Sequence, residues 1–332
     1  MEKFLALTVD GQGSELAAEV REYAIDQLPE GDVTIRVAYS GVNYKDGLAS
    51  IPDGKIVRSY PHVPGIDLAG TVLASSSPDF REGDEVLVTG YGLGVSRFGG
   101  FSQAARVPAD WVVPLPKGLT ALEAMALGTA GFTAALSVHR LEENGLSPGR
   151  GPALVSGATG GVGSWAVALL ARSGYEVTAS SRKAGESGYL RELGASEIVT
   201  PAELEVPAGR SLGRERWAAA VDPVGGPTLP HVLASVRYGG SVALSGLTGG
   251  ADFAATVYPF ILRGVNLLGI DSVFCPMDVR RAVWDRLAAE WKPGEALVGA
   301  IARVIALAEL PEALGQVLRG QMRGRAVVAL GD

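Results

Sequence analysis

The 332-residue sequence has a single cysteine, Cys275, which excludes a disulfide within the chain and a cysteine-rich metal site. Its three histidines, His62, His139 and His231, are far apart and show no metal-ligand spacing. We predict His139 on a helix surface and His62 in a loop. No metal site is therefore expected.

Long apolar runs and basic blocks are also missing. Gly, Ser or Arg interrupts the apolar stretches well before the ~20 residues that a membrane span needs. The N-terminal segment lacks the basic-then-apolar pattern of a secretory signal. Lys and Arg total 29 against 36 Asp and Glu, giving a net charge of −7, which argues against a nucleic-acid or anionic-membrane surface. We expect a cytoplasmic protein that binds small molecules, with local groups holding any anionic ligand.

Glycine, in contrast, is abundant at 45 dispersed residues, as in folds with many tight strand–helix turns. Residues 1–122 are predicted to be β-rich, with a strand at 99–107 among others, and residues 123–270 alternate strands and helices. This alternation predicts a parallel sheet covered on both faces. Residues 271–332 add a helix and a last strand that return to the first domain. The predicted fold class is α/β, a doubly wound Rossmann sheet plus a β-rich, partly open barrel.

A glycine-rich turn from Ser156 to Gly163 follows a short apolar run and precedes an apolar helix. Its glycines supply positive φ angles and a surface without Cβ atoms, and the helix N-terminus offers N–H groups to an anion. Gly163 is predicted to let the helix pack closely on the strand. In this context the pattern predicts a dinucleotide site, and a tight turn without a ligand is the alternative. The predicted contacts are Gly157, Thr159, Gly160, Gly161 and Val162.

Ser181, Arg182 and Lys183 follow the next predicted strand, where an Asp or Glu would hold the ribose hydroxyls of NAD. A small hydroxyl followed by two cations suits a 2′-phosphate, through charge-assisted hydrogen bonds. The alternative is a solvated basic loop. The sequence therefore predicts NADPH as the cofactor.

Several segments together resemble a known family. They are Gly41-Val42-Asn43-Tyr44-Lys45-Asp46, residues 64–70, residues 128–134, the glycine-rich turn, residues 271–274 and Gly324-Arg325. The sequence resembles the medium-chain dehydrogenase/reductase superfamily, specifically its zinc-free quinone-oxidoreductase-like branch, and is similar to the acrylyl-CoA reductase (AcuI/YhdH-type) family. The zinc enzymes of the superfamily have a Cys where this chain has Asn43 and a His where it has Ile66, which agrees with the expected lack of a metal.

The resemblance implies a GroES-like first domain, an NADP-binding Rossmann domain and a homodimer. In the dimer, the apolar edge strand at residues 265–270 would pair with its twin and cover exposed backbone groups. The resemblance also places Asn43 and Tyr44 beside the nicotinamide. Tyr44 is then a candidate acid and cofactor contact, or alternatively a packed aromatic, and Asp46 orients its neighbours. Further implied cofactor contacts are Thr129, Gly246, Leu247, Phe274 and Arg325.

Two of these implied contacts have structural alternatives, since Thr129 is also a candidate helix cap and Arg325 a plain charged residue before the last strand. The implied reaction is NADPH-dependent reduction of acrylyl-CoA to propionyl-CoA, with hydride transfer to the β-carbon and donors that stabilise the enolate. The alternatives are a quinone or enone reductase and, from another class, a catalytically silent NADPH-binding structural or sensor protein. CoA is implied by the resemblance and not by the charge pattern. Candidate cations for its phosphates, each taken singly more typical of a solvated surface, are Lys55, Arg58, Arg97 and Arg106.

Overall fold

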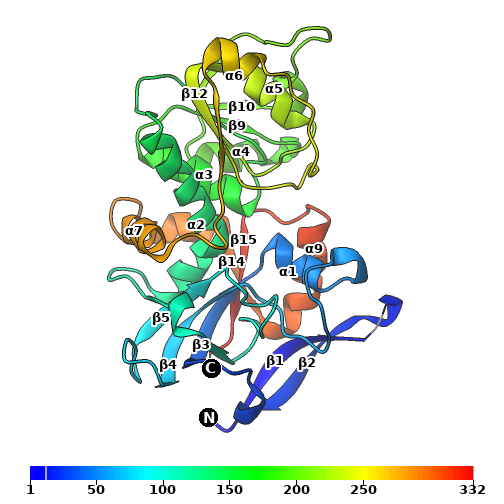
Figure 1. Cartoon of the computed structure of the whole chain (residues 1–332), viewed down its shortest axis with the longest axis vertical. Coiled ribbons are helices and arrows are strands. Elements are labelled where there is room, and N and C mark those ends of the chain that lie inside the picture. The colour runs from blue at the N-terminus through cyan, green and yellow to red at the C-terminus, as the bar shows by residue number, and fades with distance from the viewer. Residues whose placement is uncertain (12, 332) are drawn as a thin grey trace. The chain divides into compact units, whose positions relative to one another are not determined.

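The computed structural model describes residues 1–11 and 13–331 and divides the chain into two compact units (Figure 1). Unit 1 contains Met1–Thr129 and Val273–Asp332, and unit 2 contains Ala130–Ser272. The sequence predicts domain boundaries after residues 122 and 270, whereas the units divide after Thr129 and Ser272.

Unit 2 is built on a six-stranded parallel sheet with the order β10-β9-β8-β11-β12-β13. Its strands are β8 (Ala153–Val155), β9 (Val177–Ser180), β10 (Glu197–Val199), β11 (Trp217–Asp222), β12 (Val236–Leu244) and β13 (Asn266–Gly269). The helices between them are α3 (Gly161–Arg172), α4 (Ser187–Glu192), α5 (Thr228–Ser235) and α6 (Tyr258–Arg263). The parallel order confirms the predicted doubly wound sheet.

The strand order of this sheet reverses beside β8. Strands β9 and β10 lie on one side of β8, and β11, β12 and β13 lie on the other. In open α/β sheets, ligands bind outside the carboxyl ends of the strands at such a point. The glycine-rich turn follows β8 and therefore lies at this position.

Unit 1 is β-rich and contains a two-stranded β1-β2 sheet and a seven-stranded sheet in which β6 also pairs with β3. Its strands are β1 (Lys3–Asp10), β2 (Ala17–Ala24), β3 (Val33–Gly41), β4 (Asp67–Ser75), β5 (Glu85–Thr89), β6 (Ala104–Val107), β7 (Val113–Pro114), β14 (Ala302–Ala306) and β15 (Arg325–Ala329). Its helices are α1 (Tyr44–Ala49), α7 (Met277–Ala288), α8 (Glu295–Ile301) and α9 (Leu310–Leu318). Because β15 pairs with both β14 and β3, the C-terminal segment is part of the first domain's sheet.

The strand predicted at residues 99–107 is shorter than expected, because it begins only at Ala104. The preceding residues form a loop in close contact with other backbone. A Cβ added at Gly99 would lie 2.3 Å from the Gly65 carbonyl oxygen, and one at Gly100 would lie 2.0 Å from that of Asp67. The two glycines therefore serve this close approach and not a strand.

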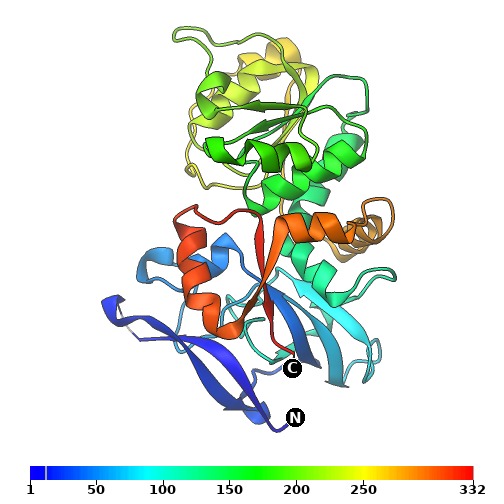
Figure 2. The same ribbon diagram turned by 180° about the vertical axis from the view of Figure 1, so that it is seen from behind.

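Helices α1 and α9 lie side by side although they are far apart in the sequence (Figures 1 and 2). A Cβ added at Gly47 of α1 would lie 2.8 Å from Cγ of Leu318 in α9, so a larger residue there would displace the Leu318 side chain. The packing fixes α1, which begins at Tyr44, against the C-terminal part of unit 1.

Helix α2 (Ala121–Glu143) is broken at Gly128, whose φ of 52° and ψ of −156° are not helical. It is the one helix within residues 1–11 and 13–331 that is long and apolar enough to cross a membrane by length and composition. However, 78% of its most apolar window is buried inside the protein, as in a core helix.

Candidate functional site

The glycine-rich turn has the geometry of a dinucleotide cradle. Gly157 adopts a φ of +55°, and a Cβ added there would lie 2.8 Å from Cγ2 of Val224. At Gly160, directly before α3, an added Cβ would meet only the Gly157 carbonyl, at 3.4 Å, so the space beside it is open. A Cβ at Gly163 would lie 2.3 Å from the Gly157 oxygen. Gly163 therefore lets α3 pack closely on the turn that follows β8. The open side of the turn meets the N-terminus of α3, where an anion is favoured.

The remaining predicted residues of this turn lie just before α3 and in its first turn. Thr159 is buried, with 5% of its surface exposed, whereas Gly161 and Val162 in the first turn of the helix are half-buried. These three residues, together with Gly157 and Gly160, could hold a pyrophosphate in unit 2.

The basic corner follows β9, which pairs directly with β8, so both features lie at the carboxyl edge of the sheet. Ser181 is tied in place, because its backbone N–H donates to the Val199 carbonyl at 3.1 Å and its Oγ accepts from the Lys183 N–H at 3.0 Å. The Arg182 side chain is exposed and that of Lys183 is half-buried. A rigid hydroxyl beside an exposed guanidinium suits recognition of a phosphate.

Two other strand ends complete this edge of unit 2. Gly246 and Leu247 follow β12, and Leu247 is 57% exposed. Asp222 ends β11 and is buried; its Oδ1 accepts from the Ser156 hydroxyl at 2.5 Å and from the Val224 N–H at 2.8 Å. Burial raises the pKa of the Asp222 carboxyl. Asp222 therefore ties the end of β8 to the turn after β11.

In unit 1, the predicted acceptor-side residues lie at the start of α1. Asn43 is the N-cap residue, and its backbone N–H donates to Oδ2 of Asp46 at 2.8 Å. Oδ1 of Asp46 accepts from the Ile66 N–H at 2.9 Å. Tyr44, the first residue of the helix, is 36% exposed, whereas Asp46 is fully buried. Asp46 thus ties the start of α1 to the residue directly before β4, and its side chain is not exposed to a ligand.

Sequence reasoning gave no role to Asp67, which is the centre of a buried polar cluster. Its Oδ2 accepts from Nδ2 of Asn43 at 2.8 Å, from the Thr129 N–H at 2.9 Å and from Nη2 of Arg325 at 3.1 Å. Its Oδ1 accepts from the Thr129 hydroxyl at 2.5 Å. A charged residue at the start of an otherwise apolar strand was the available signal, because such a residue is rarely buried without a partner.

Arg325, another predicted cofactor contact, is buried in unit 1. It is 2% exposed, and its Nη1 donates to the Val42 carbonyl at 2.9 Å and to Oδ1 of Asn43 at 2.6 Å. Its Nη2 is occupied by Asp67 and by the Met125 carbonyl. The terminal nitrogens of Arg325 thus neutralise Asp67 and fix Asn43 from inside the fold.

Thr129 also lies in this cluster, because its hydroxyl and its N–H both donate to Asp67. The arrangement depends on Gly128. A Cβ added there would lie 2.2 Å from Nη2 of Arg325 and 2.5 Å from Oδ2 of Asp67. The break in α2 thus lets the chain pass over the ion pair, and it leaves Thr129 at the start of the following helical segment.

Phe274, another predicted cofactor contact, is 70% exposed, and hydrogen bonds hold the backbone of the residue before it. The Val273 carbonyl accepts from the Tyr91 N–H and from Nη2 of Arg280, each at 3.1 Å. The Arg280 side chain is fully buried, donates to the Thr89 carbonyl at 2.9 Å and has its Cζ 4.5 Å from the centre of the Tyr91 ring. This arginine, which sequence reasoning did not single out, fixes the position of Phe274 in unit 1.

The comparisons with known proteins agree with this architecture. Residues 29–117 match the family described as "Alcohol dehydrogenase GroES-like domain", and residues 161–289 match "Zinc-binding dehydrogenase". The acrylyl-CoA reductase AcuI of Ruegeria pomeroyi is 51% identical over 98% of each chain. YhfP of Bacillus subtilis, named as a quinone oxidoreductase, is 53% identical over 98% of this chain and 99% of its own. The chain belongs to the medium-chain dehydrogenase/reductase superfamily.

Two solved structures of relatives in this superfamily contain a dinucleotide. The crystal structure of B. subtilis YhfP with NAD bound has a TM-score of 0.96 and 52% identity, and it covers 99% of this chain and 100% of that chain. That of E. coli K-12 YhdH with bound NADPH has a TM-score of 0.94 and 45% identity over 98% of this chain and 100% of that chain. The predicted superfamily and fold are thus confirmed.

The superfamily includes zinc enzymes, and a zinc site would need suitable ligands close together in this chain. Within the described part of the chain, no three His, Cys, Asp or Glu side chains gather where they could hold a metal ion. The amide of Asn43 bonds to Gly41, Asp67 and Arg325, and the neighbouring position is the aliphatic Ile66. The guanidinium of Arg325 already neutralises the Asp67 carboxylate. These residues therefore do not fit zinc, which needs three or four N, S or O ligands.

Proposed function

We propose that this protein is an NADPH-dependent oxidoreductase that reduces the C=C bond of an α,β-unsaturated acyl-CoA, acrylyl-CoA to propionyl-CoA, without zinc. The observation that carries the proposal is the 51% identity, over 98% of both chains, with a protein named acrylyl-CoA reductase. The donor set around Asn43 and Ile66, which does not fit zinc, supports a reaction without a Lewis acid.

The proposed cofactor is NADPH. Its pyrophosphate would lie on the turn from Gly157 to Val162, and its 2′-phosphate would meet Ser181, Arg182 and Lys183. The proposed further contacts, in two separate units, are Tyr44, Thr129, Gly246, Leu247 and Phe274. When bound, the reduced nicotinamide supplies the hydride. YhdH with NADPH and YhfP with NAD differ in the dinucleotide they hold, so the basic corner is the feature that favours NADPH in this chain.

The chain's own contribution to the reaction is proposed to centre on Tyr44. Hydride addition at the β-carbon of the thioester leaves negative charge on its oxygen and requires a proton at the α-carbon. A hydrogen bond from the exposed Tyr44 hydroxyl to that oxygen would stabilise the charge, or the hydroxyl would supply the proton. Asn43 and Asp46 act as positioning residues, because their hydrogen bonds hold the first turn of α1.

The decisive test follows NADPH oxidation with acrylyl-CoA and, separately, with a benzoquinone, each with and without a metal chelator. Turnover of acrylyl-CoA that the chelator does not reduce is the expected result. Turnover of the quinone alone would favour the second candidate, a quinone or enone reductase, which the 53% identity with YhfP supports. Tight NADPH binding with turnover of neither acceptor would indicate a catalytically silent binding protein.

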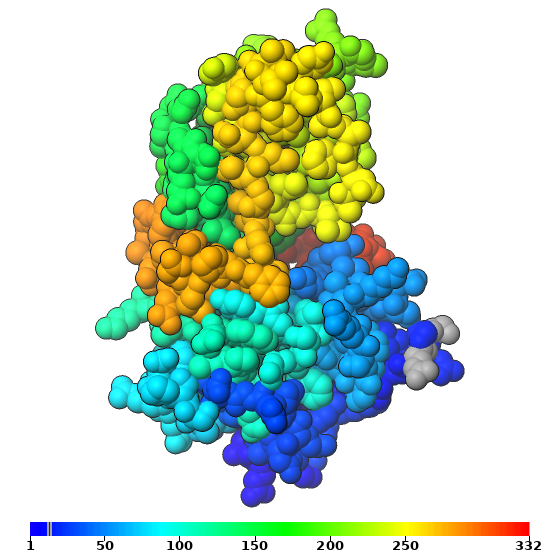
Figure 3. All heavy atoms as spheres, viewed as in Figure 1, coloured from blue at the N-terminus to red at the C-terminus, as the bar shows by residue number. Residues whose placement is uncertain are grey.

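We also propose a cytoplasmic homodimer that pairs through β13. This strand lies at one end of the sheet order in the described residues. Large apolar side chains nearby are exposed, with Val257 at 62%, Ile261 at 69% and Leu262 at 57%. Figure 3 shows their segment, in yellow, on the surface of unit 2. Pairing would cover both the strand edge and this apolar surface, and light scattering that gives the mass of a monomer would contradict it.

A further inference from the structure

The carboxylate of Asp222 accepts hydrogen bonds from two different segments of unit 2. Asp222 is fully buried at the carboxyl end of β11. Its Oδ1 accepts from the Ser156 hydroxyl at 2.5 Å, and from the backbone N–H groups of Val224 and Gly225 at 2.8 and 3.2 Å. One oxygen atom therefore holds the first residue of the glycine-rich turn together with the turn that follows β11.

The turn after β11, residues 223–226, packs against the glycine-rich turn through the side chain of Val224. A Cβ added at Gly157 would lie 2.8 Å from Cγ2 of Val224, and Gly157 is a residue with a positive φ, of 55°. The residue before Gly157, Ser156, is the one that donates to Asp222. The carboxylate thus holds the glycine-rich turn directly, and it also holds the backbone of the side chain that packs against it.

The same turn packs against the segment after β12, residues 245–250, which contains two of the proposed cofactor contacts. The Gly249 N–H donates to the Val224 carbonyl at 2.8 Å. A Cβ added at Gly246 would lie 2.2 Å from the Pro223 carbonyl oxygen, so backbone contacts backbone at this point. A shift of the turn after β11 would therefore also displace the segment after β12.

We propose that Asp222 is a positioning residue of the dinucleotide site. Its Oδ1 fixes the turn after β11, which lies against the proposed pyrophosphate cradle on one side and the segment after β12 on the other. Residues that contact a ligand bind it well only when a supporting shell of hydrogen bonds holds them in place. The inference rests on the proposed function, because the two supported segments are its proposed cofactor contacts. Since Asp222 is fully buried, it acts through these segments and not by touching the dinucleotide.

The contribution of Asp222 comes from its acceptor atom and not from its charge. A negative charge at this edge of the sheet would by itself weaken the binding of an anionic pyrophosphate. Without the carboxylate, however, the Ser156 hydroxyl and two backbone N–H groups would lose their acceptor, and a buried donor without an acceptor is energetically costly. Asp222→Asn keeps an oxygen that can accept these hydrogen bonds and removes the charge, whereas Asp222→Ala removes both.

The test measures the Kd of NADPH and of NADH by fluorescence titration for the wild type, Asp222→Ala and Asp222→Asn. Each titration is run well below the unfolding temperature of the variant, so that a loss of stability alone leaves the Kd unchanged. Kinetics with acrylyl-CoA give the KM for NADPH and kcat.

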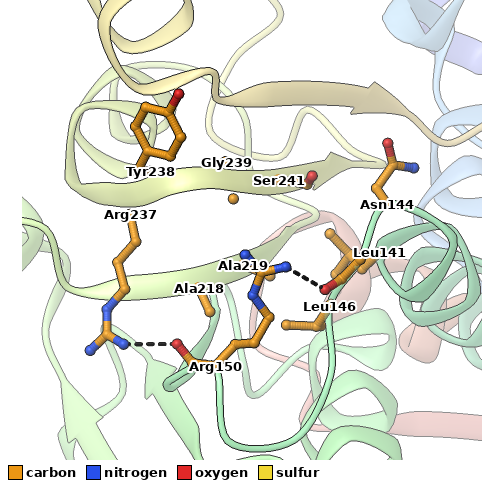
Figure 4. Close-up of a pocket in the computed structure, with 12 residues that line it drawn as sticks. Leu141, Asn144, Leu146, Arg150, Ala218, Ala219, Arg237, Tyr238, Gly239 and Ser241 are labelled. Atoms are coloured by element: carbon orange, nitrogen blue, oxygen red, sulfur yellow. Dashed lines mark hydrogen bonds between the residues drawn. The ribbon is translucent and has the colours of Figure 1, made fainter.

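The matched control is Ser241→Ala. The Ser241 hydroxyl is buried in β12 of the same sheet and accepts from Nδ2 of Asn266 at 3.3 Å. Ser241 lines a cavity of about 90 Å³ together with Arg150, which precedes β8 (Figure 4). The control therefore removes a buried hydrogen bond on the amino side of the sheet, away from the proposed cofactor contacts.

We expect Asp222→Ala to raise the Kd of NADPH and of NADH by the same factor, about tenfold, which corresponds to about 1.4 kcal/mol. Asp222→Asn should restore most of the lost affinity, because it keeps the acceptor. The KM for NADPH should rise more in Asp222→Ala than kcat falls. Ser241→Ala should lower the unfolding temperature and leave both Kd values as they are in the wild type.

If Asp222→Ala does not fold, Ser156→Ala takes its place, because it removes one of the three hydrogen bonds to Oδ1 and leaves the carboxylate in position. It should raise both Kd values about threefold or more. An unchanged Kd in the folded variant would overturn the inference.

Two further outcomes would also overturn the inference. An equal loss of affinity in Asp222→Ala and Asp222→Asn would show that the charge matters and the acceptor does not. A loss for NADPH alone would connect Asp222 with the 2′-phosphate and not with the two supported segments. If the wild type binds NADPH but does not reduce acrylyl-CoA, the proposed reaction fails, yet the comparison of Kd values still decides the role of Asp222.

Discussion

The buried carboxyl of Asp46 makes the stability of the protein depend on pH in a way that can be measured. Its pKa is raised from 3.8 to about 7, mainly by burial and then by the nearby Asp67 carboxylate. The hydrogen bonds from Asn43 and Ile66 lower this pKa and offset part of the increase. Because the folded pKa lies above the unfolded one, the folded chain binds the proton more tightly between these values. The free energy of unfolding should therefore fall as pH rises from about 4 to about 7. At about 1.4 kcal/mol per pH unit, the total is about 4 kcal/mol.

The matched variant is Asp46→Asn, which has no titrating group. Its amide nitrogen would face a backbone N–H, so the variant carries a cost of about 1–3 kcal/mol that does not depend on pH. Between pH 5 and pH 8, the stability gap between wild type and variant should narrow by about 3 kcal/mol in urea unfolding. An infrared carboxylic-acid band that is absent from the variant should disappear from the wild type near pH 7. A band that is lost near pH 4 would refute the reasoning.

Three further predictions follow from close contacts in the two units. Gly163→Ala places a methyl group against the Gly157 oxygen and should destabilise unit 2 by about 1–3 kcal/mol and weaken dinucleotide binding, as measured by thermal unfolding and calorimetry. Arg182→Gln with Lys183→Gln should weaken NADPH binding about tenfold or more and leave NADH binding unchanged in fluorescence titration; an equal loss for both would contradict the 2′-phosphate assignment. Arg280→Met removes the hydrogen bond to the Val273 carbonyl and should raise the KM for NADPH more than it lowers kcat, with partial rescue in Arg280→Lys. An unchanged KM would show that this hydrogen bond is not needed to position Phe274.

The Rossmann unit was predictable because its signals are local. A strand, a turn with glycines at 157, 160 and 163, and a helix follow one another within about twenty residues, and each requires a particular backbone. The positive φ of Gly157 and the close backbone contact at Gly163 then follow from sterics. The strand, the turn and the helix can therefore be recognised within one short segment of the sequence.

The cluster around Asp67 was not predictable in this way, because its members come from four distant segments. Asp67 and Arg325 are separated by 258 positions and meet only after β15 enters the sheet beside β3. Asn43, Asp46, Thr129 and Arg325 are recognisable in the sequence, but the family resemblance predicts contacts with the cofactor and substrate for them. In the fold, Asn43, Thr129 and Arg325 also form hydrogen bonds with the buried Asp67 carboxylate, which would be strongly destabilising without partners.

This convergence explains why Asn43 has a fixed position. The terminal nitrogens of Arg325 donate to Oδ2 of Asp67 and to Oδ1 of Asn43, and Asn43 in turn donates to Asp67. Removing either charged partner would leave the other buried and unpaired, which is strongly destabilising. The position of Asn43, the residue before Tyr44, therefore depends on this one buried ion pair.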